Sequence, residues 1–282
     1  MGSCWRAPPT HLNMTLFFDI ETGPRSSAIL DLLERDPWPD PVAPDPFDAD
    51  SVLTGNIRDP EKINAKILAA QEKHAAAVQK ALKDHLEGGL KRERSTWERA
   101  PLDPALAEIL SIQYAIGRRG EVEVLTGSEA DILNEFFAVA QKRQIWINWT
   151  GSNGSGNFDL NHIYRRASAM RVERTVDHFD ALHRSENLAK KMLLFSGWNS
   201  FLGLEKAARE LGCPILECPL TGKDFHSWFK GEAEGSEFDP EEQKRWADRY
   251  SRQDIILMQM IDSCLDNNSD DFESAIKSHS RL

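Results

Sequence analysis

The alternation of apolar and polar positions predicts short buried strands between amphipathic helices. Thr15–Ile20 (TLFFDI) is apolar and rich in β-forming residues, which is typical of a buried strand. Gly117–Gly120 (GRRG) separates two further strand patterns, and this short link with a glycine at each end favours a β-hairpin. The further predicted strands are Glu108–Ile116, Glu121–Leu125 and Gln144–Trp149.

Helical periodicity is found in five stretches with recognisable ends. Ser128 with Asp131 three residues later predicts a capped helix. Its buried stripe comprises Ile132, Leu133, Phe136 and Phe137. Asp239 and Pro240 are a strong N-cap and first-turn pair, starting a helix that extends to Leu265. The other predicted helices run from Asp59-Pro60 to about Trp97 with a break at Gly88-Gly89, from about Asp159 to Met170, and from Asn199 or Ser200 to Gly212.

The order of these elements predicts the fold class. A strand, a helical insertion, two strands, a helix, a strand and further helices give an α/β protein with a mixed sheet flanked by helices. We expect one domain over residues 15–266 with the insertion at about 59–99, after an N-terminal extension (1–14) and before a polar, frayed tail (267–282). Five prolines in Asp36–Pro46 predict an extended loop.

Composition and charge restrict the function classes. The net charge of −11 argues against tight, sequence-indifferent coating of duplex DNA. It does not argue against a metal-dependent nuclease, because carboxylates that hold cations add negative charge. The chain has neither a transmembrane-length apolar run nor a secretory leader pattern, so we expect a cytoplasmic protein with no membrane partner. Its cysteines lack paired spacing, which predicts free thiols at Cys4, Cys213, Cys218 and Cys264.

Three segments carry candidate metal-ligating carboxylates. Asp19 and Glu21 are two apart at the end of a strand, so they point to one face and repel each other unless a cation lies between them. Asp159 begins a helix after a loop rich in glycine, serine and asparagine. Tyr250 and Asp254 are four apart and share one helix face. Taken singly, these residues also fit a solvated strand end, a helix cap and a surface aspartate.

The combination and order of the three segments resemble the DEDD, or DnaQ-like, 3′–5′ exonucleases of the ribonuclease H-like fold. FFDIET resembles the first motif of that family, GNFDL the second and YSRQD the third. The Y-x-x-x-D spacing is that of the tyrosine subclass, similar to the proofreading domain of family B DNA polymerases; Arg249 stands where the histidine subclass has histidine. The chain departs from the family in a longer loop before Asp159 and in the insertion Glu61–Arg99.

The resemblance implies a role for each matching residue. It implies two divalent cations, Mg²⁺ or Mn²⁺, bridged by Asp19, with Glu21 and Asp254 completing one site and Asp159 supporting the other. Tyr250 is implied to orient the attacking water. The implied substrate contacts are Thr22, Asn153, Asn157 and Phe158.

The implied function is hydrolysis of single-stranded nucleic acid from its 3′ end, with DNA favoured over RNA. An exonuclease for RNA or short oligoribonucleotides is an alternative, and a catalytically inactive nucleic-acid-binding module is another. The Y-x-x-x-D motif disfavours other ribonuclease H-like enzymes such as endonucleases and transposases. Proofreading would require a polymerase or repair partner in trans. The insertion, with nine basic and six acidic residues over Glu61–Arg99, is either a basic arm for the substrate or a surface elaboration.

Overall fold

The computed structural model describes residues 14–42, 44–149, 157–196, 203–266 and 269–281. By its internal contacts the chain divides into two compact units, which we call the sheet unit (Met1–Arg25 and Ala100–Leu282) and the arm unit (Ser26–Arg99). Each unit is described by itself. Among the described residues, no helix combines the length and apolar character needed to cross a membrane.

A five-stranded sheet in the order β3-β2-β1-β4-β5 forms the centre of the sheet unit. The strands are β1 (Thr15–Pro24), β2 (Ala107–Ile116), β3 (Glu123–Thr126), β4 (Ile145–Asn148) and β5 (Ser185–Asn187). The β1–β2 and β2–β3 pairs are antiparallel, whereas β1–β4 and β4–β5 are parallel. The predicted mixed α/β sheet is therefore confirmed, and the GRRG link joins an antiparallel pair as expected.

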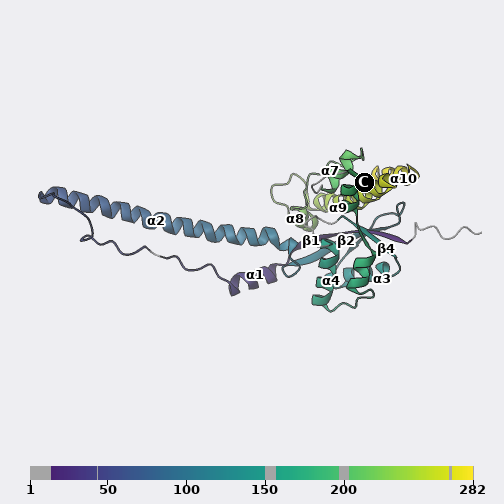
Figure 1. Cartoon of the computed structure of the whole chain (residues 1–282), viewed down its shortest axis with the longest axis horizontal. Helices are drawn as coiled ribbons and strands as arrows, with labels where there is room; N and C mark the ends of the chain where they lie inside the picture. Colours follow the sequence, from purple (N-terminus) through teal and green to yellow (C-terminus); the bar gives the residue numbers. More distant parts are fainter. Residues whose placement is uncertain (1–13, 43, 150–156, 197–202, 267–268, 282) are drawn as a thin grey trace, which may run out of the picture. The chain divides into compact units, whose positions relative to one another are not determined.

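Helices cover both faces of this sheet (Figure 1). On one face, Leu16 and Phe18 pack with α3 (Glu129–Ala140) and α4 (Phe158–Met170). Phe17 points to the other face and joins the cluster formed by α9 (Pro240–Leu265) and its neighbours. Because successive strand residues alternate between faces, a strand buried on both sides requires the continuous apolar run at the start of β1.

The predicted ends of the main helices agree with the structure. The Ser128 side chain accepts a hydrogen bond from the Asp131 amide at the start of α3, and Asp239 caps α9 before Pro240. The remaining helices of the sheet unit are η2 (Ala100–Leu102), α5 (His178–Arg184), α6 (Leu188–Ser196), α7 (Leu204–Glu210), α8 (Phe225–Lys230) and α10 (Ser269–His279). The predicted helix start at Asn199 or Ser200 lies outside the described residues, within which α7 begins after the extended Gly203.

The C-terminal segment is also more ordered than predicted. Instead of fraying, Ser269–His279 forms α10, which packs on α9. Phe272, Ala275 and Ile276 contribute to the same apolar cluster as α9, and Asp271 is fully buried in ion pairs with arginines. Three apolar residues at helical spacing are enough to dock this helix because α9 already presents an apolar surface.

The arm unit contains α1 (Ser26–Arg35) and the 40-residue helix α2 (Pro60–Arg99). The predicted break at Gly88-Gly89 does not occur, and α2 continues through both glycines. The Trp38 indole lies so close that a Cβ built on Gly88 would be 2.9 Å from Trp38 Cζ2. Glycine costs a helix about 1 kcal/mol relative to alanine. Here the close approach of Trp38, which also donates a hydrogen bond to His85, offsets part of that cost.

Candidate metal centre

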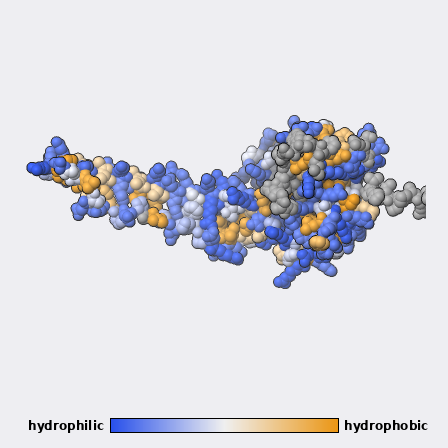
Figure 2. All heavy atoms as spheres, in the orientation of Figure 1, coloured by the Kyte–Doolittle hydropathy of each residue, from blue (hydrophilic) through white to orange (hydrophobic). Residues whose placement is uncertain are grey.

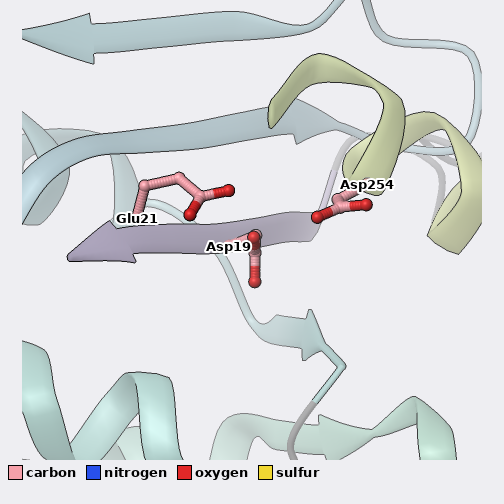
Figure 3. Close-up of side chains that lie close together, drawn as sticks. All are labelled: Asp19, Glu21 and Asp254. Atoms are coloured by element: carbon pink, nitrogen blue, oxygen red, sulfur yellow. The ribbon is translucent and has the colours of Figure 1, made fainter. Parts of the chain in front are cut away.

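Three of the predicted carboxylates meet at one point. Asp19 and Glu21 project from β1 and Asp254 from α9, and one oxygen from each lies within 4.8 Å of the others (Figure 3). Asp19 and Glu21 are on the same face of β1 as Phe17, which packs with α9. Residues separated by more than 230 positions are thereby brought within the reach of a single cation.

Asp159 is the fourth member of the group, which we call the carboxylate cluster (Asp19, Glu21, Asp159 and Asp254). It lies in the first turn of α4 and its side chain is almost entirely buried. Asn148, the last residue of β4, donates a hydrogen bond of 2.7 Å from Nδ2 to Asp159 Oδ2. Asp159 is not within the 4.8 Å group. It is nevertheless near enough to Asp19 that the negative charge of Asp19 adds to the effect of burial and raises the pKa of Asp159.

Burial raises the pKa values of all four carboxyls, and repulsion by neighbouring carboxylates adds to the effect at Glu21, Asp159 and Asp254. Burial raises the pKa of Asp19 to about 7. The pKa of Glu21 is well above its ordinary value because the group is buried and because Asp19, Asp254 and Asp159 are negative. Burial, followed by the charge of Asp19, raises the pKa values of Asp159 and Asp254 in the same way.

None of the ion pairs formed among the described residues includes a member of the cluster. Four buried carboxylates cannot all ionise at neutral pH without a counter-charge. An all-oxygen donor set of this kind is what Mg²⁺ and Mn²⁺ prefer. The residues present therefore fit a divalent cation.

Tyr250 stands one helical turn before Asp254 on α9. Burial, and then the charges of Asp254, Glu21 and Asp19, raise its pKa above the ordinary value, so the phenol stays protonated at neutral pH. In the part of the chain that the structure describes, its hydroxyl makes no hydrogen bond and remains free to donate one. A Cβ on Gly222 would lie 3.3 Å from this hydroxyl, so a glycine at position 222 keeps the space beside it open.

The predicted substrate contacts differ in their surroundings. The Thr22 hydroxyl donates to the Pro101 carbonyl at 2.7 Å, just after a register shift between Glu21 and Thr22. Phe158, the first residue of α4, is partly buried and packs against the core. The Asn157 side chain is engaged internally: it exchanges hydrogen bonds with Asn148 and accepts the Leu160 amide as the α4 cap. Asn153 lies outside the described residues.

Three polar residues at the site were not predicted from the sequence. Asn148 is fully buried and links Asp159 to Asn157. Ser111 and Gln113 of β2, also fully buried, stand opposite Glu21 and Asp19 and are joined by a 2.6 Å hydrogen bond. Their signal is a polar residue inside an apolar strand pattern, since such a residue requires a partner.

Comparison with known proteins adds no assignment. No protein-family model matches the chain, no curated protein is similar in sequence, and no solved structure matches it.

Proposed function

We propose that this protein is a metal-dependent 3′–5′ exonuclease of the ribonuclease H-like fold that removes nucleotides from single-stranded nucleic acid, with DNA the favoured substrate. One observation carries the proposal. Carboxylates of the first and third motifs meet beside a free tyrosine hydroxyl, with Asp159 of the second motif close enough to interact with them and no counter-charge among the described residues. The sequence order of these motifs is that of the DEDD family's tyrosine subclass, which supports the same conclusion.

The residues of the site have different roles in this proposal. Asp19, Glu21 and Asp254 would hold divalent cations, and Asp159, kept in place by Asn148, would support a second ion. Two such cations supply positive charge that acidifies the attacking water and stabilises the leaving 3′ oxygen. Tyr250 donates a hydrogen bond that orients the attacking water, because its raised pKa excludes it as a general base.

A binding module without catalysis would not need this arrangement. Burying mutually repelling carboxylates destabilises the fold unless cations neutralise them, and nucleic-acid phosphates are themselves repelled by the acids. Strongly perturbed acids gathered beside a hydrogen-bond donor are instead typical of an active site. We therefore favour the enzyme over the inactive module.

The polarity of digestion tests the proposal. With Mg²⁺ or Mn²⁺, a 3′-labelled single strand should lose its label at once, a 5′-labelled strand should shorten stepwise, and a closed circular strand should survive. Excess EDTA should stop the reaction, and Asp19→Asn serves as the inactive control. Parallel DNA and RNA strands decide the sugar preference. Rapid cutting of the circle would assign the protein to the endonucleases, and digestion in EDTA would exclude the metal mechanism.

A further inference from the structure

The arm unit presents a straight row of lysines. Helix α2 has no buried residue, and Figure 2 shows hydrophilic residues along much of its length. Four exposed lysines lie at intervals of four, seven and seven residues along α2. In an α-helix this spacing places them within about 40° of one another around the helix axis, in a row about 27 Å long. This lysine row comprises Lys62, Lys66, Lys73 and Lys80.

The row keeps its positive charge. Lys73 and Lys80 form no ion pair among the described residues, and Lys66 contacts only the neutral carbonyl of Leu53. Lys62 has one exposed partner, Asp59, at 3.9 Å, a pairing that contributes little. The glutamates alongside the row, Glu61 and Glu72, lie roughly 80–100° away around the helix. Asp84, one turn beyond Lys80, is on the face of the row but forms no ion pair with it among the described residues.

The acidic part of the arm unit lies against a different face of α2. The segment 36–58 carries many aspartates and contacts the helix through His74, His85 and Arg92. These three residues lie about 100° from the lysine row. Apart from Lys66, whose ammonium donates to the Leu53 carbonyl of this segment, the row is therefore left open while the neighbouring face is covered.

We propose that the lysine row binds the sugar–phosphate backbone of a nucleic-acid strand. Basic residues are concentrated here: Glu61–Arg99 holds nine of the 34 basic but only six of the 45 acidic residues, so acids exceed bases by 14 elsewhere in the chain. A row of flexible ammonium groups suits phosphates, which are spaced regularly and carry no sequence information. This inference rests on the proposed function for the identity of the polyanion.

Other occupants fit the row less well. A membrane-surface helix inserts apolar side chains between its basic ones, but the exposed leucines of α2 lie away from the row. Leu68, Leu82 and Leu86 are roughly 120° or more away, and Leu90, beyond the end of the row, is roughly 100° away. A second copy of the chain is acidic overall, but it would pair through those leucines and not through like-charged lysines. The phosphate backbone is the one occupant that uses the lysines alone.

Strand binding by the full-length protein in EDTA separates this inference from catalysis. The probe is a fluorescein-labelled 40-nucleotide single strand, followed by anisotropy across a salt series. The row variant is Lys66→Gln, Lys73→Gln and Lys80→Gln. The matched control, with the same change in net charge, is Lys142→Gln, Lys190→Gln and Lys277→Gln, at exposed positions of the sheet unit.

The row variant should bind the strand about tenfold more weakly or worse at low salt, and its slope of log K against log salt should fall by about 2. The control should keep the wild-type slope, and the three row residues changed to arginine should restore it. Equal losses in the row and control variants, or an unchanged slope in the row variant, would overturn the inference. Row-dependent binding without digestion in Mn²⁺ would contradict the proposed function alone.

Discussion

Two groups of buried carboxylates lie on or near the same helix, α9, and their surroundings are opposite. The carboxylate cluster has no cationic partner among the described residues. Two turns later, Asp262 is more deeply buried than Asp254 but receives hydrogen bonds from Arg118 at 2.7 Å and Lys191 at 2.8 Å. The second group, which we call the arginine–aspartate network, comprises Arg118, Arg119, Lys191, Asp262, Asp266 and Asp271.

The two groups differ in whether the chain itself supplies the neutralising positive charge. In the network the chain supplies its own cations, and the ion pairs fix the β2–β3 hairpin link and α10 against α9. Burial alone would raise the pKa of Asp266, but hydrogen bonds from Arg118 and Lys191 lower it below its ordinary value. In the cluster burial is opposed only by hydrogen bonds, such as that from Asn148 to Asp159, and the pKa values rise. In the network each buried aspartate has a cationic partner from the chain, whereas the cluster has none among the described residues and could hold a metal ion.

Removing one carboxylate from the cluster should have the largest effect on rate. Asp254→Asn keeps the volume of the side chain but removes a metal ligand, so activity should fall by about 10³-fold or more, equivalent to about 4 kcal/mol of transition-state stabilisation. The melting temperature in EDTA should stay the same or rise, because repulsion with Asp19 is relieved. Initial rates on a labelled single strand measure the first effect. Wild-type activity in the variant would show that the third motif is misassigned.

The matching change in the network should act on stability instead. Asp262→Ala leaves Arg118 and Lys191 without their best partner, and breaking a buried ion pair costs about 3–5 kcal/mol of unfolding free energy. We expect the lower end of that range, since Asp266 and Asp271 remain nearby. Urea unfolding measures the loss, and the rate per folded molecule should be unchanged. A tenfold loss of rate in the fully folded variant would remove the distinction between the two groups.

Tyr250→Phe tests whether the hydroxyl beside the carboxylate cluster orients the attacking water. The substitution keeps the ring, which packs near Phe225, and deletes only the hydroxyl. Misorienting the attacking water typically costs on the order of 10²-fold in rate, so measurable activity should remain. Mn²⁺ binding should match the wild type. If the variant is as inactive as Asp254→Asn while still binding Mn²⁺, Tyr250 does more than orient water.

The pH dependence of stability should differ in sign between the two groups. In EDTA, the cluster carboxyls bind more protons in the folded than in the unfolded protein. Their contribution should therefore be present at about pH 4 and be lost as pH rises through the folded pKa of Asp19, about 7. Asp266 has a lowered pKa, so its contribution is present above about pH 4 and lost as pH falls.

Melting temperatures of the wild type and Asp19→Asn in EDTA from pH 5 to pH 8 measure this effect. The wild type should lose more stability than the variant over that range, and Mn²⁺ should reduce the difference. Parallel curves for the two proteins would contradict the raised pKa of Asp19.

Local rules predicted the elements that carry the site. Alternation along a strand places Asp19 and Glu21 together, and helical spacing does the same for Tyr250 and Asp254, so neither pair requires knowledge of the tertiary fold. Asp239 marks the start of α9 through its own cap hydrogen bond. The sequence therefore predicted the contents of the cluster well.

The missing features depend on contacts between distant residues. The continuity of α2 depends on Trp38, about 50 positions from the glycines that it contacts. Helix α10 depends on a surface supplied by α9 and on arginines of the hairpin link. Asn148 is a polar residue at the end of an apolar strand, and its partners Asp159 and Asn157 come from another segment of the chain. No periodicity within the chain encodes such partners.

Cation binding tests the central claim most directly. Titration of the metal-free protein with Mn²⁺, with free Mn²⁺ followed by its electron paramagnetic resonance signal, counts the ions bound to wild type, Asp254→Asn and Asp262→Asn. The wild type and Asp262→Asn should bind two ions per chain with similar affinity, and Asp254→Asn should bind them at least about tenfold more weakly. If the wild type binds no Mn²⁺, or binds it as weakly as Asp254→Asn, the carboxylate cluster is not a metal centre.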